Sequence, residues 1–180
     1  MENQIVTVFS DASYASGKAG WAFWAKHQGE TLRVSRGITF RVDSISDAET
    51  IALCTAIMRS VEHFNLRDAI VVAQSDSTDA LGSLLYAGWA NGKNQFFRVA
   101  KNTDVRPQIP KKVNSIRATF CKRVLDLVAE RNITVYLKHV RAHTGKDNAR
   151  SHVNAWCDQE AKKRMRAVVP YDGEPTQVQS

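Results

Sequence analysis

The chain has 180 residues, of which 43% are hydrophobic and 24% charged, and this suits one globular domain with its own core. A formal net charge of +7 favours a polyanionic partner such as nucleic acid, although a well-solvated basic protein would show the same balance. No apolar run is long enough to span a bilayer, and Glu2 and Asn3 stand where a leader would be basic, so we expect a cytoplasmic protein without a membrane partner.

The first predicted element is an apolar, β-branched strand over residues 5–11 that ends on Asp11 and would be buried on both faces. Residues 12–20 have the composition of a turn-rich link. Residues 21–26 and 31–38 then predict two more strands joined by a glycine-containing hairpin loop. We expect these three strands to form an antiparallel meander.

The first helix is expected to begin at Ser46, which with Glu49 has the spacing of a capping box. A second buried strand follows over residues 69–75 and leads directly into Asp76. A helix between the meander and this strand supplies the crossover that parallel pairing needs. Because parallel neighbours end at the same edge of a sheet, we expect Asp11 and Asp76 to emerge together.

The second half of the chain begins with a helix capped by Ser77 or Thr78. Residues 87–112 lose this periodicity and form a long basic segment with interleaved aromatic residues. A helix from about Ser115 and a fifth strand over residues 133–140 come next, and a last helix follows a polar segment. Residues 1–166 are therefore expected to form one domain, with a flexible tail over 167–180. Three cysteines lie far apart and are odd in number, which favours buried free thiols: Cys54, Cys121 and Cys157.

This element order, with acids at the ends of two strands and in the first turn of a helix, resembles the ribonuclease H family. The close of the chain adds a histidine on a glycine-containing loop and a helix that begins with a Cys-Asp-X-X-Ala pattern. The residues that carry the resemblance are Asp11, Glu49, Asp76, His143 and Asp158. It implies an α/β ribonuclease H-like fold with a five-stranded mixed sheet flanked by helices, in which strand four is parallel to strand one.

The resemblance also implies a monomeric, metal-dependent endonuclease that hydrolyses the RNA strand of an RNA–DNA hybrid and leaves 5′-phosphate ends. Carboxylates suit Mg²⁺ or Mn²⁺, and two such ions about 4 Å apart can bracket a scissile phosphate. Asp11 would contact both ions, Glu49 and Asp76 would complete one site, and Asp158 would complete the other. His143 would assist proton transfer or product departure.

Each acid also has a structural interpretation. A strand-end aspartate often forms a turn, and Glu49 alone would be a helix cap. Asp147 or Asn154 could stand in for Asp158, whereas Asp79 is expected to be an exposed helix acid. Two other functions remain open: a nuclease of the same superfamily acting on structured or duplex DNA, and a non-catalytic nucleic-acid-binding domain.

The residues expected to contact the nucleic acid come from the edge of the site and from the basic segment. They are Ser13, Ser46, Ser77, Lys93, Arg98, Lys101, Lys111 and Lys112. The aromatics of the segment, Trp89, Phe96 and Phe97, either stack on the substrate or close the core. Ala12 replaces the glycine that usually follows the first aspartate of the family, so we expect substrate preference to differ at the turn over 12–20.

Overall fold

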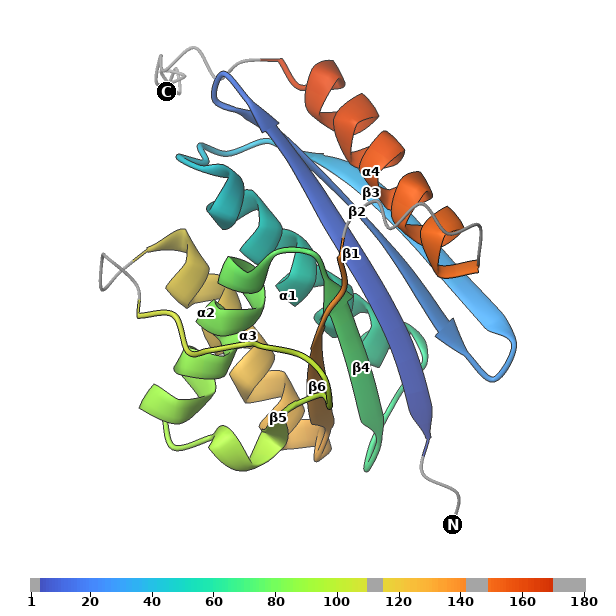
Figure 1. The fold of residues 1–180 in the computed structure, drawn as a ribbon, viewed down its shortest axis with the longest axis vertical. Coiled ribbons are helices and arrows are strands. Elements are labelled where there is room, and N and C mark those ends of the chain that lie inside the picture. The colour runs from blue at the N-terminus through green and yellow to red at the C-terminus, as the bar shows by residue number, and fades with distance from the viewer. Residues whose placement is uncertain (1–3, 110–114, 142–148, 170–180) are drawn as a thin grey trace, which may run out of the picture.

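A computed structural model describes residues 4–109, 115–141 and 149–169, in which one mixed sheet is flanked by helices on both faces (Figure 1). The strands are β1 (Ile5–Ala15), β2 (Lys18–His27), β3 (Glu30–Ile38), β4 (Ile70–Ser75), β5 (Phe97–Val99) and β6 (Thr134–His139), in the order β3-β2-β1-β4-β6-β5. The helices are α1 (Ile45–His63), α2 (Thr78–Ala90), α3 (Ile116–Arg131) and α4 (Ala149–Ala167), with a 3₁₀ turn η1 (Asn94–Phe96).

The first hairpin is tighter than expected. β1 does not end at Asp11 but continues to Ala15 and pairs with the start of β2, so the predicted link over 12–20 is wrong. The turn consists only of Ser16 and Gly17, whose φ angles of 51° and 77° are the two positive values of a type I′ turn. This two-residue turn leaves the residues on either side free to extend the ladder. Asp11 therefore lies inside a strand, with neighbours that hold its backbone.

The parallel half of the sheet agrees with the expected topology. β1 pairs in parallel with β4, and the last paired residues are Phe9 and Gln74. Asp11 and Asp76 each lie two residues beyond this pair, so both side chains arrive at the same end of the sheet. β4 also pairs in parallel with β6, which places β4 at the centre of the sheet.

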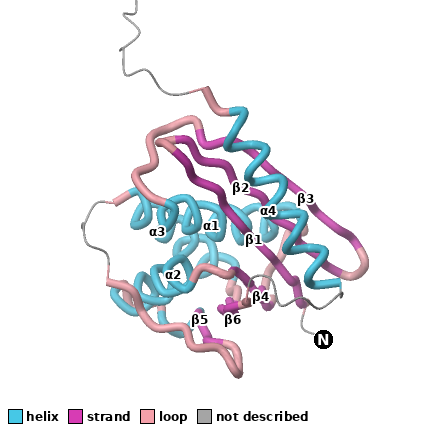
Figure 2. Tube along the Cα trace, turned by 45° about the horizontal axis from the view of Figure 1, so that its top comes forward, coloured by secondary structure: helices cyan, strands magenta, loops and turns pink. Residues whose placement is uncertain are grey.

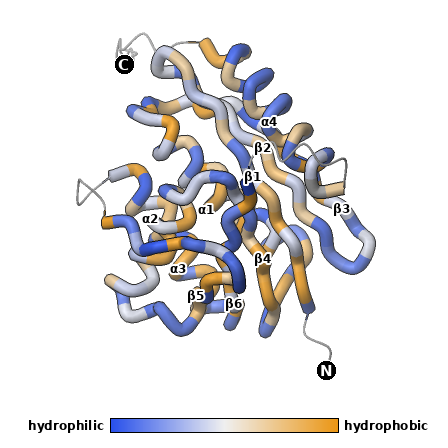
Figure 3. The backbone as a smooth tube through the Cα atoms, viewed as in Figure 1, coloured by the Kyte–Doolittle hydropathy of each residue, from blue (hydrophilic) through white to orange (hydrophobic). Residues whose placement is uncertain are grey.

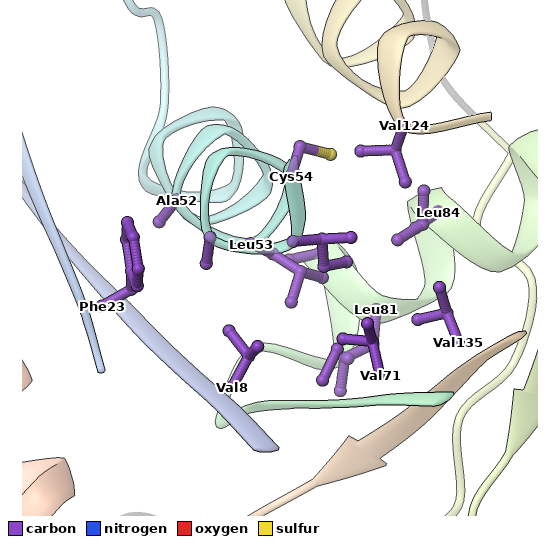
Figure 4. Close-up of a cluster of buried hydrophobic side chains, with 14 of the residues drawn as sticks. Val8, Phe23, Ala52, Leu53, Cys54, Val71, Leu81, Leu84, Val124 and Val135 are labelled. Carbon is purple, nitrogen blue, oxygen red and sulfur yellow. The ribbon is translucent and has the colours of Figure 1, made fainter. Parts of the chain in front are cut away.

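Two layers of helices cover the sheet. Helices α1, α2 and α3 lie against one face and α4 crosses the other (Figures 1 and 2). The larger core lies between the sheet and the three helices, where side chains from all of these elements meet (Figure 4). Its labelled members include Val8, Phe23, Leu53, Leu81, Val124 and Val135. Hydrophobic residues accordingly colour β4 and part of β1, while α4 is largely hydrophilic (Figure 3).

A smaller core fixes α4 to the opposite face of β1 and β2. It contains Phe9, Ala22, Cys157 and Ala161, all buried. The backbone of α4 comes so close that a Cβ at Gly20 would lie 2.4 Å from the Met165 nitrogen. A residue with a side chain at position 20 would therefore push α4 off the sheet.

The basic segment supplies a sixth strand, which corrects the predicted count of five. Within residues 87–112, α2 continues to Ala90, and Phe97 to Val99 pair in parallel with β6. Phe97 is 3% exposed and closes the core, whereas Trp89 is 65% exposed and contacts Tyr86 at a ring distance of 5.8 Å. All three cysteines are buried and free, as expected. No helix in the described ranges is long and apolar enough to cross a membrane.

Candidate active site

The carboxylates of Asp11, Glu49 and Asp76 converge just beyond the point where the parallel pairing of β1 and β4 ends. One oxygen from each lies within 4.8 Å of one from each of the others. Asp11 and Glu49 are buried, at 7% and 6% exposure, and Asp76 is half-buried. Asp11 comes from β1, Asp76 directly follows β4, and Glu49 comes from α1. The structure thus brings together three of the four acids that the sequence nominated.

One backbone amide joins two of these acids. The N–H of Ala12 donates to Asp11 Oδ1 at 2.8 Å and to Glu49 Oε1 at 3.2 Å. Glu49 Oε2 is buried and has no hydrogen-bond partner among the residues that the structure describes. Glu49 is not a cap, because the N-cap of α1 is Ser44 and not Ser46; the Ser44 hydroxyl accepts from the Asp47 amide. The predicted capping box is therefore wrong, and the glutamate is free to face the site.

The electrostatics of the cluster are unfavourable without a cation. Burial, together with the charges of Asp76 and Asp158, raises the pKa of Asp11 from 3.8 to about 7, against the opposing effect of the Ala12 hydrogen bond. Burial likewise raises the pKa of Glu49 well above its usual range, with the charges of Asp11 and Asp76 adding to the effect. Three close acids with an unpartnered buried oxygen form a ligand set that suits a hard divalent cation.

The fourth nominated acid, Asp158, lies near the cluster but not within it. Its charge acts on Asp11, yet its Oδ2 accepts a hydrogen bond from Lys162 Nζ at 2.8 Å. The preceding residue, Cys157, is packed against β1, where its thiol is 3.9 Å from the Phe9 carbonyl oxygen. Asp158 is therefore held beside the site by an ion pair with Lys162, one turn further along α4.

Asp79 was expected to be an exposed helix acid, but it is half-buried and connects three segments. Its Oδ2 accepts from Ser46 Oγ at 2.8 Å and its Oδ1 accepts from Gln108 Nε2 at 3.1 Å. The backbone N–H of Gln108 donates to the Gly82 carbonyl oxygen at 2.9 Å, and this bond holds residues 104–109 against α2. Asp79 thus joins the first turn of α1, which leads to Glu49, to the first turn of α2.

The predicted nucleic-acid contacts are only partly gathered around the acids. Ser13 is half-buried on β1 two residues beyond Asp11, and Ser77 is the N-cap of α2, accepting from the Ala80 amide. Ser46 is engaged by Asp79. Of the basic residues, Lys93 is half-buried and Lys101 exposed, while exposed Arg98 donates to the carbonyl oxygens of Asn94 and Phe97. Four of the residues named from the sequence lie outside the described ranges: Lys111, Lys112, His143 and Asp147.

Sequence reasoning missed the connecting role of Asp79. The one signal available was its place in the first turn of α2, three residues after Asp76. Ser46, its partner, is 33 residues away in sequence, and no local pattern joins the two.

The fold is shared with solved structures of low sequence identity. RNase H1 from the halophilic archaeon Halobacterium salinarum aligns with a TM-score of 0.55 and 14% identity over 90% of this chain and 98% of that one. LC11-RNase H1, isolated from compost by a metagenomic approach, aligns with a TM-score of 0.60 and 16% identity over 92% of this chain and 97% of that one. The structure of LC11-RNase H1 in complex with an RNA/DNA hybrid aligns with a TM-score of 0.57 and 16% identity over 89% of this chain and 96% of that one.

Among proteins with curated descriptions, none matches the sequence. The family model of RNase H, however, matches residues 3–166, which include every element described above except the last residue of α4. The match includes all three acids of the cluster, Asp11, Glu49 and Asp76. By this match the chain belongs to the RNase H family.

Proposed function

We propose that this ribonuclease H hydrolyses the RNA strand of RNA–DNA hybrids with the help of divalent cations and leaves 5′-phosphate and 3′-hydroxyl ends. The observation that carries the proposal is the convergence of Asp11, Glu49 and Asp76 within 4.8 Å, just beyond the last parallel pair of β1 and β4. Family membership and the LC11-RNase H1 complex with an RNA/DNA hybrid support the choice of substrate.

The residues present fit a metal site. Asp11, Glu49 and Asp76 would hold one Mg²⁺ or Mn²⁺, and Asp11 with Asp158 would hold a second, in a two-metal-ion arrangement. Bound ions supply positive charge to the scissile phosphate and lower the pKa of an attacking water.

The protein's own contribution is to hold the acids at a fixed separation. The Ala12 N–H donates to both Asp11 and Glu49 and so holds the two carboxylates together. The Asp79 carboxylate accepts from Ser46 and so connects the first turn of α1 to the first turn of α2. Lys162 holds Asp158 in an ion pair, for which a bound cation would compete. Such preorganisation means that little reorganisation is needed when the charges of the transition state develop.

A comparison of substrates tests the proposal. Labelled RNA–DNA hybrid, duplex DNA, duplex RNA and a DNA junction are incubated with the protein, with and without Mg²⁺ or Mn²⁺. We expect the RNA strand of the hybrid to be cut only when the metal is present, because the protein would recognise 2′-hydroxyl groups and duplex shape. Faster cutting of the junction or the DNA duplex would contradict the choice of substrate, and binding without any turnover would contradict catalysis.

A further inference from the structure

Residues 104–109 lie against the first half of α2 as the chain runs from β5 toward the start of α3 (Figure 1). Val105 is buried in the larger core at 7% exposure, and the backbone N–H of Gln108 donates to the Gly82 carbonyl oxygen at 2.9 Å. Position 82 has no room for a side chain, because a Cβ there would overlap the Arg106 carbonyl oxygen. The segment is therefore held close to α2, and the backbone of Gln108 has a fixed position.

The side chain of Gln108 completes a chain of hydrogen bonds between three segments. Its Nε2 donates to Asp79 Oδ1 at 3.1 Å, and the other oxygen of this carboxylate accepts from Ser46 Oγ at 2.8 Å. An ionised carboxylate only accepts, so Gln108 and Ser46 must both be donors. With one donor on each oxygen, the Asp79 carboxylate cannot turn toward one partner without lengthening its bond to the other.

Both ends of this chain lie three residues from an acid of the cluster. Ser46 precedes Glu49 in α1, and residues three apart are neighbours on a helix surface. Asp79 follows Asp76 and stands in the first turn of α2. Within α1 and α2, both of which the structure describes in full, the Ser46–Asp79 bond is the one side-chain hydrogen bond that joins the two helices.

The acids need such a connection because they repel one another. The charges of Asp11 and Asp76 oppose the ionisation of Glu49, and Glu49 Oε2 has no hydrogen-bond partner in the described ranges. Repulsion acts to separate α1, which carries Glu49, from the chain that leads through Asp76 into α2. A bond between the first turns of the two helices resists this separation, whereas a divalent cation needs its carboxylate ligands close together.

We propose that Gln108 is a positioning residue for the divalent-cation site. Through Asp79 and Ser46 it keeps Glu49 and Asp76 at the separation that a bound cation requires. The assignment of a cation to these acids rests on the proposed function. In this role Gln108 needs no contact with the cation or the substrate, because its donor acts by fixing the orientation of the Asp79 carboxylate.

Exchanging the donor and the acceptor at positions 79 and 108 tests this role. Gln108→Ala removes the donor, and Gln108→Glu places a second carboxylate against Asp79. In Asp79→Asn/Gln108→Glu, the asparagine oxygen can accept from Ser46 while the asparagine amide donates to the introduced glutamate, so both bonds return at the wild-type net charge. Gln95→Glu is the control, since it makes the same change at an exposed position of the same basic segment.

Two measurements report on the site itself. Calorimetry gives the affinity of the free protein for Mn²⁺, and cutting of the hybrid at saturating substrate gives kcat. We expect Gln108→Ala to lower both about threefold and Gln108→Glu to lower both about tenfold, because a lost hydrogen bond costs less than two carboxylates in contact. The exchange variant should recover both values to within about twofold of wild type, and Gln95→Glu should leave them unchanged.

The proposal is overturned if Gln108→Ala keeps the wild-type Mn²⁺ affinity and kcat, or if the exchange variant is no better than Gln108→Glu. It is also overturned if the losses appear only in KM, which would indicate a contact with the substrate. An exchange variant that regains the wild-type Tm in EDTA but not the Mn²⁺ affinity would leave Gln108 a purely structural role. Mn²⁺ binding does not depend on hydrolysis, so a wild type that binds Mn²⁺ and cuts no hybrid would contradict the proposed function alone.

Discussion

Replacing Asp11 with asparagine should stabilise the protein in the absence of metal while removing its activity. Burial and neighbouring acids raise the Asp11 pKa from 3.8 to about 7, so the folded state binds a proton between these values that the unfolded state has released. Stability from this group is therefore present at low pH and is lost as the pH rises from about 4 to 7. Asparagine has no charge to bury and can still accept from the Ala12 amide.

The magnitude follows from the size of the pKa shift. A rise of about 3 units corresponds to roughly 4 kcal/mol at pH 8, at 1.36 kcal/mol per unit. Part of this free energy is offset because the neighbouring acids change their own protonation when the Asp11 charge is removed. We therefore expect Asp11→Asn to raise the free energy of unfolding by about 2 to 4 kcal/mol. For a chain of this size the gain corresponds to a rise in Tm of roughly 5 to 12 °C.

Thermal unfolding in EDTA between pH 4 and 8.5 measures the effect, and the same series in Mg²⁺ measures its reversal. The difference in Tm should be largest at pH 8 and should shrink toward pH 4. Mg²⁺ should stabilise wild type but not the variant, because binding to the folded state adds stability only where a site exists. Asp126→Asn is the matched control, since Asp126 is 66% exposed and paired with Lys122 on α3. An Asp11→Asn protein that is less stable than wild type at pH 8 in EDTA would refute the reasoning.

Three further predictions concern the supports of the site. Gly82→Ala should destabilise the protein by about 1 to 2 kcal/mol in denaturant unfolding, because a Cβ would overlap the backbone carbonyl oxygen of Arg106. A gain of stability, usual for this change in a helix, would contradict the prediction. Asp79→Ala should lower kcat about tenfold with little change in KM, since the change frees Ser46 and the first turn of α1. Asp79→Asn keeps one acceptor oxygen and should lose less activity. Equal losses of kcat in the two variants would argue against a positioning role. The apparent affinity for Mg²⁺ by calorimetry should rise from pH 6 to 8 as Asp11 loses its proton, and a flat profile would be inconsistent with its raised pKa.

The parallel pairing of the central strands could be predicted, because strands buried on both faces are recognisable in the sequence as continuous apolar runs. The two apolar runs that precede Asp11 and Asp76 pair in parallel as expected, and this pairing brings the two acids together. Glu49 was placed by the order of elements, although its predicted role as a cap was wrong. The site therefore follows from topology more than from local geometry.

The errors have local physical causes. The first hairpin turn is only two residues long, but Ser16 and Gly17 lie among other small and polar residues, so composition suggested a wider link. The β5 strand has only three residues, too few for an alternating pattern to appear. The bonds of Asp79 depend on how α1, α2 and residues 104–109 pack, which no sequence window contains.

The central claim is that the clustered acids hold divalent cations for hydrolysis of RNA in a hybrid. The most direct measurement is cleavage of a 5′-labelled RNA–DNA hybrid by wild type, Asp76→Asn and the Asp126→Asn control, with Mn²⁺, with Mg²⁺ and with EDTA. We predict that wild type and the control cut the RNA strand only with metal, and that Asp76→Asn is at least about a thousandfold slower while remaining folded. Cleavage in EDTA, or wild-type rates in Asp76→Asn, would contradict the account.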